Sequence, residues 1–296
     1  MESLSLIEII KKFSTEKKCV KYYEKIRWPN GVRCLSCDSD QITYFETKGK
    51  TNKPRYLYNC RDCHYQFSVT VNSIFHDSHL PLSKWFVAIY LICSSPKGIS
   101  ANQLHKILQV NYKTAWYMAH RIRLAMQEDE GFCQKFSDVC EVDEAYIGGK
   151  GTGKRGRGSS NKVPVVGLKE KTSGKIRLKA ITDVSRTILS QFIRDNVKKN
   201  TEIHTDSFKS YKWLDSSEFT HKVVQHYKGY VNFTADGEKI HTNGVENVWS
   251  LFKRGLVGVY HKLSEHYLSL YLDEFVFKFN NRGNKGMLDL VLKKTF

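Results

Sequence analysis

Four cysteines, arranged as two matched C-x-x-C pairs, most constrain what this chain can fold into. They are Cys34, Cys37, Cys60 and Cys63. Thiolates paired at this spacing are typical ligands of a tetrahedral structural zinc ion. A unit this small buries too little apolar surface to fold alone, so the metal would supply much of its folding free energy. We therefore predict a zinc ribbon within residues 30–79, with one pair on each of two tight turns.

The chain is strongly basic, with 47 Lys and Arg against 30 Asp and Glu and a formal net charge of +17 over 296 residues. A balance of this kind favours a polyanionic partner, usually nucleic acid, because neutralised phosphates release condensed counterions. The alternative is a basic surface without a partner. Since no apolar run approaches the ~18 residues of a membrane span, we expect no membrane partner.

The N-terminus, MESLSLIEIIKKF, lacks the layout of a signal peptide. The eight cysteines of this long basic chain do not suggest a disulfide scaffold. Both observations favour a reducing compartment. We expect a cytoplasmic protein that associates with the nucleoid when it binds DNA, or a nuclear one in a eukaryote.

Helical periodicity marks two segments before the β-rich part of the chain, residues 1–29 and 80–130. In the second, a short helix over 101–108, a three-residue turn and a longer basic helix follow the outline of a helix-turn-helix. Lys113, Arg121 and Arg123 on the longer helix are candidate DNA contacts. The alternative is that these helices only pack against each other.

From residue 138 to residue 285 the pattern changes to short β-branched runs separated by helices. Five runs read as strands, at residues 139–144, 163–168, 175–181, 202–205 and 222–225. A helix over 185–198 separates the third run from the fourth. This order predicts an α/β domain with a mixed sheet and flanking helices. Residues 286–296 are expected to be a C-terminal tail.

Three acidic residues are placed where strands end or a helix passes, although the chain as a whole is basic. Asp143 closes the first strand, Asp206 follows the fourth, and Glu246 lies at the margin of a helical apolar stripe. Carboxylates gathered in this way are the usual ligands of two Mg²⁺ ions in phosphoryl transfer. Lys253, about two turns beyond Glu246, or Arg254 would then contact a phosphate.

A glycine-rich basic loop, GGKGTGKRGRGSSNK, lies between the first two strands. It is not a phosphate-binding P-loop, because Arg follows the Gly-Lys pair where Ser or Thr is needed and no helix comes next. We expect a mobile basic arm whose Lys154, Arg155 and Arg157 contact a nucleic-acid backbone.

These motifs together resemble the insertion-sequence 1595/1016 transposases, an ISXO2-like family of DDE transposases related to the eukaryotic Merlin elements. The resemblance runs from about residue 18 to residue 283 and is carried by RWPNGVRC, DEAYIGGK, HTDSF and, most specifically, HTNGVENVWSLFKRG with YLDEFVFKFNNR. It implies an RNase H-like catalytic domain and Mg²⁺-dependent DNA cleavage and strand transfer. It also implies a zinc ribbon and a helix-turn-helix that recognise terminal inverted repeats.

The resemblance assigns the acid triad to Asp143, Asp206 and Glu246 and the basic residue that follows it to Lys253. Some relatives carry Asn as the third member, which makes Asn243 the alternative; Glu246 is favoured because only a carboxylate neutralises a metal ion strongly. A homodimer or higher oligomer on double-stranded DNA is expected because two element ends are handled together.

Two other functions stay open at this point. The chain could be a non-catalytic DNA-binding regulator built from the ribbon and the helix-turn-helix, or an RNase H-like nuclease without strand transfer.

Overall fold

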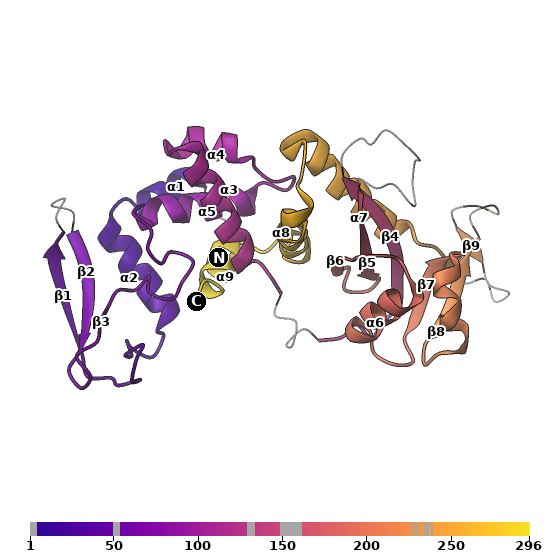
Figure 1. The fold of residues 1–296 in the computed structure, drawn as a ribbon, viewed down its shortest axis with the longest axis horizontal. Coiled ribbons are helices and arrows are strands. Elements are labelled where there is room, and N and C mark those ends of the chain that lie inside the picture. The colour runs from indigo at the N-terminus through magenta and orange to yellow at the C-terminus, as the bar shows by residue number, and fades with distance from the viewer. Residues whose placement is uncertain are drawn as a thin grey trace. The chain divides into compact units, whose positions relative to one another are not determined.

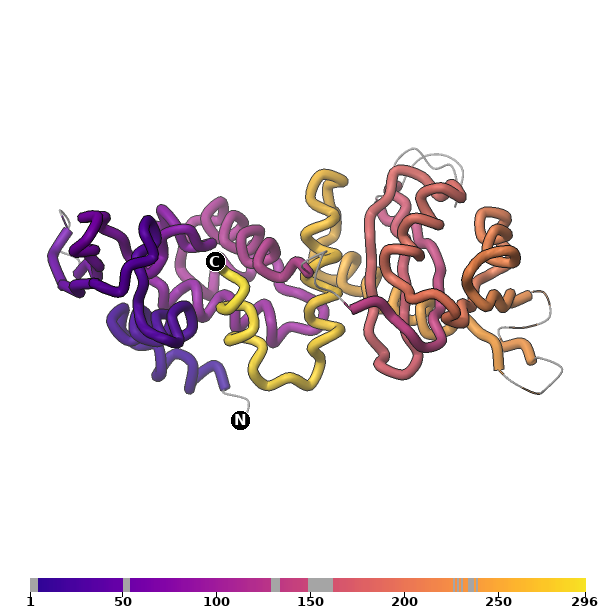
Figure 2. Tube along the Cα trace, turned by 90° about the horizontal axis from the view of Figure 1, so that it is seen from below, coloured from indigo at the N-terminus to yellow at the C-terminus, as the bar shows by residue number. Residues whose placement is uncertain are grey.

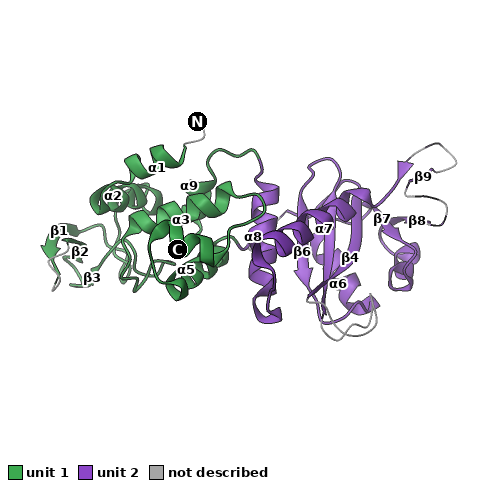
Figure 3. Ribbon diagram, turned by 90° about the horizontal axis from the view of Figure 1, so that it is seen from above, with its two compact units in different colours: residues 1–126, 283–296 green, residues 127–282 purple. Residues whose placement is uncertain are grey.

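The chain divides into two units (Figure 3), one formed by Met1–Met126 with Gly283–Phe296 and the other by Gln127–Arg282. The computed structural model describes residues 5–49, 54–128, 134–148, 162–225, 227, 229, 231–233, 237 and 239–296. Within these ranges no helix has both the length and the apolar character needed to cross a membrane.

Unit 1 contains a three-stranded antiparallel sheet, which follows two helices in the chain (Figure 1). Its strands β1 (Ile42–Lys48), β2 (Pro54–Cys60) and β3 (Gln66–Phe67) lie in chain order. The rings of Tyr58 and Phe67 stack with centroids 5.4 Å apart. A sheet with so few apolar side chains would gain stability from a metal ion bound at the cysteine cluster described below.

Helices make up the rest of unit 1. They are α1 (Leu6–Lys12), α2 (Glu16–Arg27), α3 (Leu82–Ser94), α4 (Ala101–Leu108), α5 (Tyr112–Ala125) and α9 (Met287–Lys293). The Ser100 side chain caps α4 by accepting from the N–H of Gln103, and α4 ends at Gln109 in the left-handed region, with φ of 50°. The buried face of α3 supplies the centre of the core.

The last residues of the chain are part of this core. Leu288, Val291 and Leu292 of α9 are buried, and the Tyr23 and Thr295 hydroxyls lie 2.6 Å apart. The prediction of a tail therefore missed a helix.

Unit 2 is built on a five-stranded mixed sheet in the order β6-β5-β4-β7-β8. The strands are β4 (Cys140–Gly148), β5 (Lys162–Glu170), β6 (Ile176–Ala180), β7 (Glu202–Asp206) and β8 (Thr220–Val224). β4, β5 and β6 pair antiparallel, whereas β7 is parallel to both β4 and β8. The predicted α/β class with a mixed sheet is confirmed.

Helices and short turns connect and cover these strands. They are α6 (Arg186–Asn196), η1 (Lys209–Ser216), α7 (Asn243–Gly255), η3 (Leu256–Tyr260), η4 (Glu265–Tyr267) and α8 (Leu268–Asn280), and a two-stranded ribbon pairs β9 (Asn232–Phe233) with β10 (Lys239–Ile240). α8 runs alongside β6 (Figure 2), where the Asn280 side chain both accepts from and donates to the backbone of Ile176.

Alternation along β4 divides the core of unit 2 between the two faces of the sheet. Cys140 and Val142 pack with α6 and η1 on one face, while Ala145 and Ile147 pack with α7 and α8 on the other. Asp143 is two residues from Ala145 along the strand, so its side chain lies on the same face of the sheet, the face toward α7. The alternation of side chains along β4 therefore determines which residues can take part in the candidate site.

Candidate active site

Two central parallel strands bring Asp143 and Asp206 together. β4 and β7 pair with Cys140 opposite Ile203 and Glu141 opposite His204. Carried two residues further, the same register sets Asp143 beside Asp206. Neighbouring strands lie about 4.8 Å apart, so the two carboxylates lie on the same face of the sheet. Asp206 ends β7, whereas Asp143, predicted to close its strand, lies within β4, which continues to Gly148.

Glu246 comes from α7, the helix that covers this face. Its Oε1 accepts a hydrogen bond from the Thr242 hydroxyl at 2.9 Å, which fixes the carboxylate at the first turn of the helix. The expected apolar stripe of α7 is buried, and it consists of Val245, Val248, Trp249 and Phe252. The burial of this stripe holds the helix, and with it Glu246, against the sheet.

The three acids interact electrostatically. The pKa of Asp143 is raised to about 7, chiefly by burial and then by the charges of Glu144, Asp206 and Glu246, against a backbone hydrogen bond that lowers it. Glu144 points to the opposite face, where it accepts a hydrogen bond from the Tyr211 hydroxyl at 2.9 Å. Partly buried carboxylates that repel one another fit a bound cation, which would relieve that repulsion.

The acids are spread more widely than the ligands of a single closed site. Among the residues that the structure describes, only the cysteine quartet unites three or more potential metal ligands with all donor atoms within 4.8 Å. Asp143, Asp206 and Glu246 are all described, and they do not form such a group.

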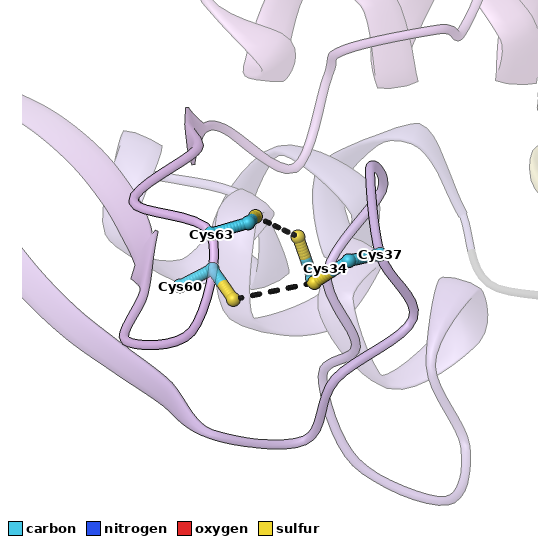
Figure 4. Close-up of side chains that lie close together, drawn as sticks. All are labelled: Cys34, Cys37, Cys60 and Cys63. Atoms are coloured by element: carbon cyan, nitrogen blue, oxygen red, sulfur yellow. Dashed lines mark hydrogen bonds between the residues drawn. The ribbon is translucent and has the colours of Figure 1, made fainter.

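The cysteines form the compact site. The Sγ atoms of Cys34 and Cys63 lie 3.5 Å apart and those of Cys37 and Cys60 lie 3.6 Å apart (Figure 4). Tetrahedral coordination with Zn–S bonds of 2.3 Å implies sulfur separations of about 3.8 Å. Backbone N–H groups, that of Cys63 first, lower the pKa of Cys60 to about 7, whereas the neighbouring thiols raise the pKa of Cys37 to about 12. The fit to zinc therefore rests on the geometry of the four sulfurs. The four residues therefore fit a structural zinc ion.

Two family models match this chain, one over the segment with the four cysteines and one over the segment with the three acids. The family model described as the ISXO2-like transposase domain matches residues 135–280, and the transposase zinc-ribbon domain matches residues 14–66. The chain belongs to the ISXO2-like transposase family. The expected family resemblance is thus confirmed.

Two relatives of this transposase support the assignment. A protein in the transposable element ISH50 of Halobacterium salinarum is 28% identical over 283 residues, which cover 90% of this chain and 91% of that protein. A transposase-like protein of Haemophilus influenzae is 31% identical over 117 residues, 40% of this chain and 90% of that protein.

A solved structure was also matched, that of the simian T-cell lymphotropic virus intasome in complex with the PP2A regulatory subunit B56 gamma. The alignment covers 60% of this chain and 67% of that chain, with 13% identity and a TM-score of 0.30.

Of the residues of this transposase predicted to contact DNA, Lys113 and Arg254 are exposed. Arg121 donates to the carbonyl of His76 at 2.9 Å, and its guanidinium lies 5.2 Å from the Tyr117 ring centroid. Lys253 is exposed in the last turn of α7, about 10 Å along the axis from Glu246. Lys154, Arg155 and Arg157 lie outside the described residues.

Arg123 requires a correction. It was predicted to face DNA, but only 2% of it is exposed. The reason is helical phase: Arg123 comes four residues after Ala119, which belongs to the buried face of α5. A side chain held there cannot reach a phosphate.

Two residues of this transposase that the sequence analysis did not single out help to hold the elements that carry the acids, and one of them contacts Asp143 directly. Glu141 is buried, and its Oε2 accepts a hydrogen bond from the N–H of Val245 at 2.8 Å while its Oε1 lies 3.2 Å from Nδ1 of His241. Trp249 donates its indole N–H to Oδ2 of Asp143 at 3.1 Å. Strand alternation could have placed Glu141 on the face of Asp143, since they are two residues apart.

Proposed function

We propose that the protein is a DDE transposase that cleaves DNA at the terminal inverted repeats of an insertion sequence and joins the freed ends to target DNA. The observation that carries this proposal is the pairing of β4 with β7, which sets Asp143 beside Asp206 on the face that α7 covers with Glu246. The raised pKa of Asp143, to which both other acids contribute, supports the same cluster.

The fold of the catalytic domain, in this proposal, is RNase H-like. Three antiparallel strands continued by two parallel ones, in the order β6-β5-β4-β7-β8, support it. Fold alone does not carry an activity, so the argument rests on the acids at the two central strands.

Asp143, Asp206 and Glu246 would hold two Mg²⁺ ions. When bound, such ions stabilise the attacking and leaving oxygens of an in-line displacement at phosphorus. Ligands shared between two ions about 3.5–4 Å apart span more than a single-ion site, in keeping with the spread of these acids. Lys253 and Arg254 would bind the phosphates on either side of the cut.

The reaction has two displacement steps. In the first, a water oxygen bonds to the phosphorus at the element end and the bond from phosphorus to the 3′ oxygen breaks, which leaves a free 3′-OH. In the second, that 3′ oxygen bonds to a target phosphorus and displaces the target's own 3′ oxygen. The role of the protein side chains is to hold and align the groups that react.

Recognition of the element end is assigned to unit 1. The zinc ribbon and the helix-turn-helix of α4 and α5, with Lys113 exposed at the start of α5, would bind double-stranded DNA, and the net charge of +17 supports a nucleic-acid partner. Two ends must be processed together, so the working form is a homodimer or higher oligomer. The reaction takes place where the DNA lies, in the cytoplasm, or in the nucleus of a eukaryotic host.

The test is a joining assay with a labelled element end and a plasmid target in Mg²⁺. Wild-type protein is expected to nick the end and form joint products, while Asp206→Asn binds the end but forms neither. Binding without nicking by the wild type would favour a non-catalytic regulator, and nicking without joint products would favour a plain nuclease.

A further inference from the structure

The indole of Trp249 lies against β5 directly beside Asp143. Trp249 is buried, and its Nε1 donates to Oδ2 of Asp143 at 3.1 Å. Asp143 pairs with Gly167 across β4 and β5. The indole therefore occupies the space next to Asp143 that a side chain at residue 167 would otherwise take.

Gly167 leaves this space open. A Cβ built at Gly167 would lie 2.4 Å from Cζ2 and 2.8 Å from Cη2 of Trp249, distances that real Cβ atoms do not show. A glycine inside a strand weakens it and often marks a close approach of another group. The approaching group here is the six-membered ring of Trp249.

The hydrogen bond acts on one oxygen of the Asp143 carboxylate. An indole N–H only donates, and when buried it needs an acceptor. With Oδ2 held by the indole, the rotation of the carboxylate is restricted, so Asp143 presents its oxygens in one fixed orientation. Carboxylates that bind metal ions are commonly fixed in this way by a neighbouring donor.

We propose that Trp249 is a positioning residue of the metal site, which fixes Asp143 through its indole N–H, and that Gly167 makes room for that indole. This inference rests on the proposed function, because it takes Asp143 to be a metal ligand. The proposed role of Trp249 is its hydrogen bond to Asp143 and not only the apolar space that it fills. Phenylalanine would fill most of the same apolar space in the cluster of Val245, Phe252 and Leu268, yet it has no N–H.

The experiment measures Mn²⁺ binding by the full-length, zinc-loaded protein without DNA, from the electron paramagnetic resonance signal of free Mn²⁺ at pH 8. Trp249→Phe is expected to weaken the affinity about tenfold or more. The matched control is Trp213→Phe, since Trp213 is also buried in unit 2 but packs on the opposite face of the sheet. It should bind Mn²⁺ like the wild type. Equal affinity of Trp249→Phe and wild type would overturn the inference.

A second variant tests the space at Gly167. Gly167→Ala should displace the indole and weaken Mn²⁺ binding to the same degree as Trp249→Phe. Phenylalanine lacks the ring atoms that the new Cβ would meet, so the double variant should bind no more weakly than Trp249→Phe alone. Additive losses in the double variant would contradict the proposed link between the two residues.

Asp143→Asn separates a failure of this inference from a failure of the proposed function. If Asp143→Asn binds Mn²⁺ like the wild type, Asp143 is not a ligand and both proposals fall. If Asp143→Asn loses the site while Trp249→Phe keeps wild-type affinity, only the role of Trp249 is excluded. Far-ultraviolet circular dichroism of each variant establishes that it is folded.

Discussion

The buried carboxylate of Glu141 accepts a hydrogen bond from the backbone N–H of Val245, with Oε2 and N 2.8 Å apart. β4 carries both Glu141 and Asp143, and Val245 directly precedes Glu246 in α7. This contact therefore couples the positions of two of the three acids. It also places a negative charge at the helix N-terminus, where unpaired N–H groups favour it.

The close contact depends on Gly244. A Cβ at Gly244 would lie 2.6 Å from Oε2 of Glu141 and 2.9 Å from Nζ of Lys169. The added methyl should push the buried Glu141 carboxylate off the N–H of Val245, so we expect Gly244→Ala to lower the free energy of unfolding by about 1–3 kcal/mol, the cost of a buried unpaired polar group. Urea unfolding followed by circular dichroism measures it. Gly258→Ala is the control, since nothing lies within 4 Å of a Cβ there. Equal stability of the two variants would argue against the tight packing.

Asp143 should make stability depend on pH. Its pKa is about 7 in the folded protein and near 3.9 in an unfolded chain, so folding stabilises the protonated form. That contribution is complete below pH 4 and is lost as the pH rises to about 7. Without magnesium, the wild type should therefore lose free energy of unfolding between pH 5 and pH 8, and Asp143→Asn should not. The stability of the variant relative to the wild type should rise by roughly 1–3 kcal/mol over that range. Denaturant unfolding at both pH values measures the gain. If the free energy of unfolding changed equally in the wild type and in Asp143→Asn between pH 5 and pH 8, Asp143 would not have a raised pKa.

Loss of zinc should affect unit 1 and spare the sheet of unit 2. Cys60→Ser removes one thiolate of the quartet, and without the metal the small ribbon has too little core to stay folded. We expect at least a tenfold loss of affinity for an element end, measured by fluorescence anisotropy. The amide exchange protection of β4 and β7 should be unchanged. Wild-type affinity in this variant would mean that the ribbon takes no part in end binding.

Lys113 and Arg123, ten positions apart on one helix, should respond differently to alanine. Lys113 is exposed, so Lys113→Ala should weaken DNA binding and reduce the slope of log affinity against log salt by about 1. Arg123 is buried, so Arg123→Ala should lower the melting temperature and leave that slope unchanged. Binding titrations at several salt concentrations distinguish them. A reduced slope for Arg123→Ala would restore the original prediction for that residue.

Local patterns predicted much of this fold. The short helix predicted over 101–108 forms as α4, and the predicted apolar stripe beside Glu246 is buried. Contacts between distant segments were not predictable in this way. The seven-residue helix α9 is too short to be stable alone and forms because Leu288, Val291 and Leu292 are buried.

In the candidate site too, local sequence patterns were predictable and contacts between distant segments were not. The pattern of strand and helix residues indicated Asp143, Asp206 and Glu246. Asp206 ends β7 and Glu246 borders the stripe as predicted, but Asp143 lies inside β4, which continues to Gly148. The role of Trp249 was not indicated, since periodicity marks it only as apolar and its partner lies far away in the sequence. The burial of Arg123 depends on which face of α5 the rest of unit 1 covers, and basic composition does not report that.

The most direct test of the central claim, that Asp143, Asp206 and Glu246 hold the metal ions, is a change of metal specificity. Each acid is replaced in turn by cysteine, and cleavage of a labelled element end is measured in Mg²⁺ and in Mn²⁺. Because thiolates are poor ligands for Mg²⁺ and better ones for softer ions, each variant should be inactive in Mg²⁺ and recover cleavage in Mn²⁺. Full cleavage in Mg²⁺ by any of the three variants would contradict the account.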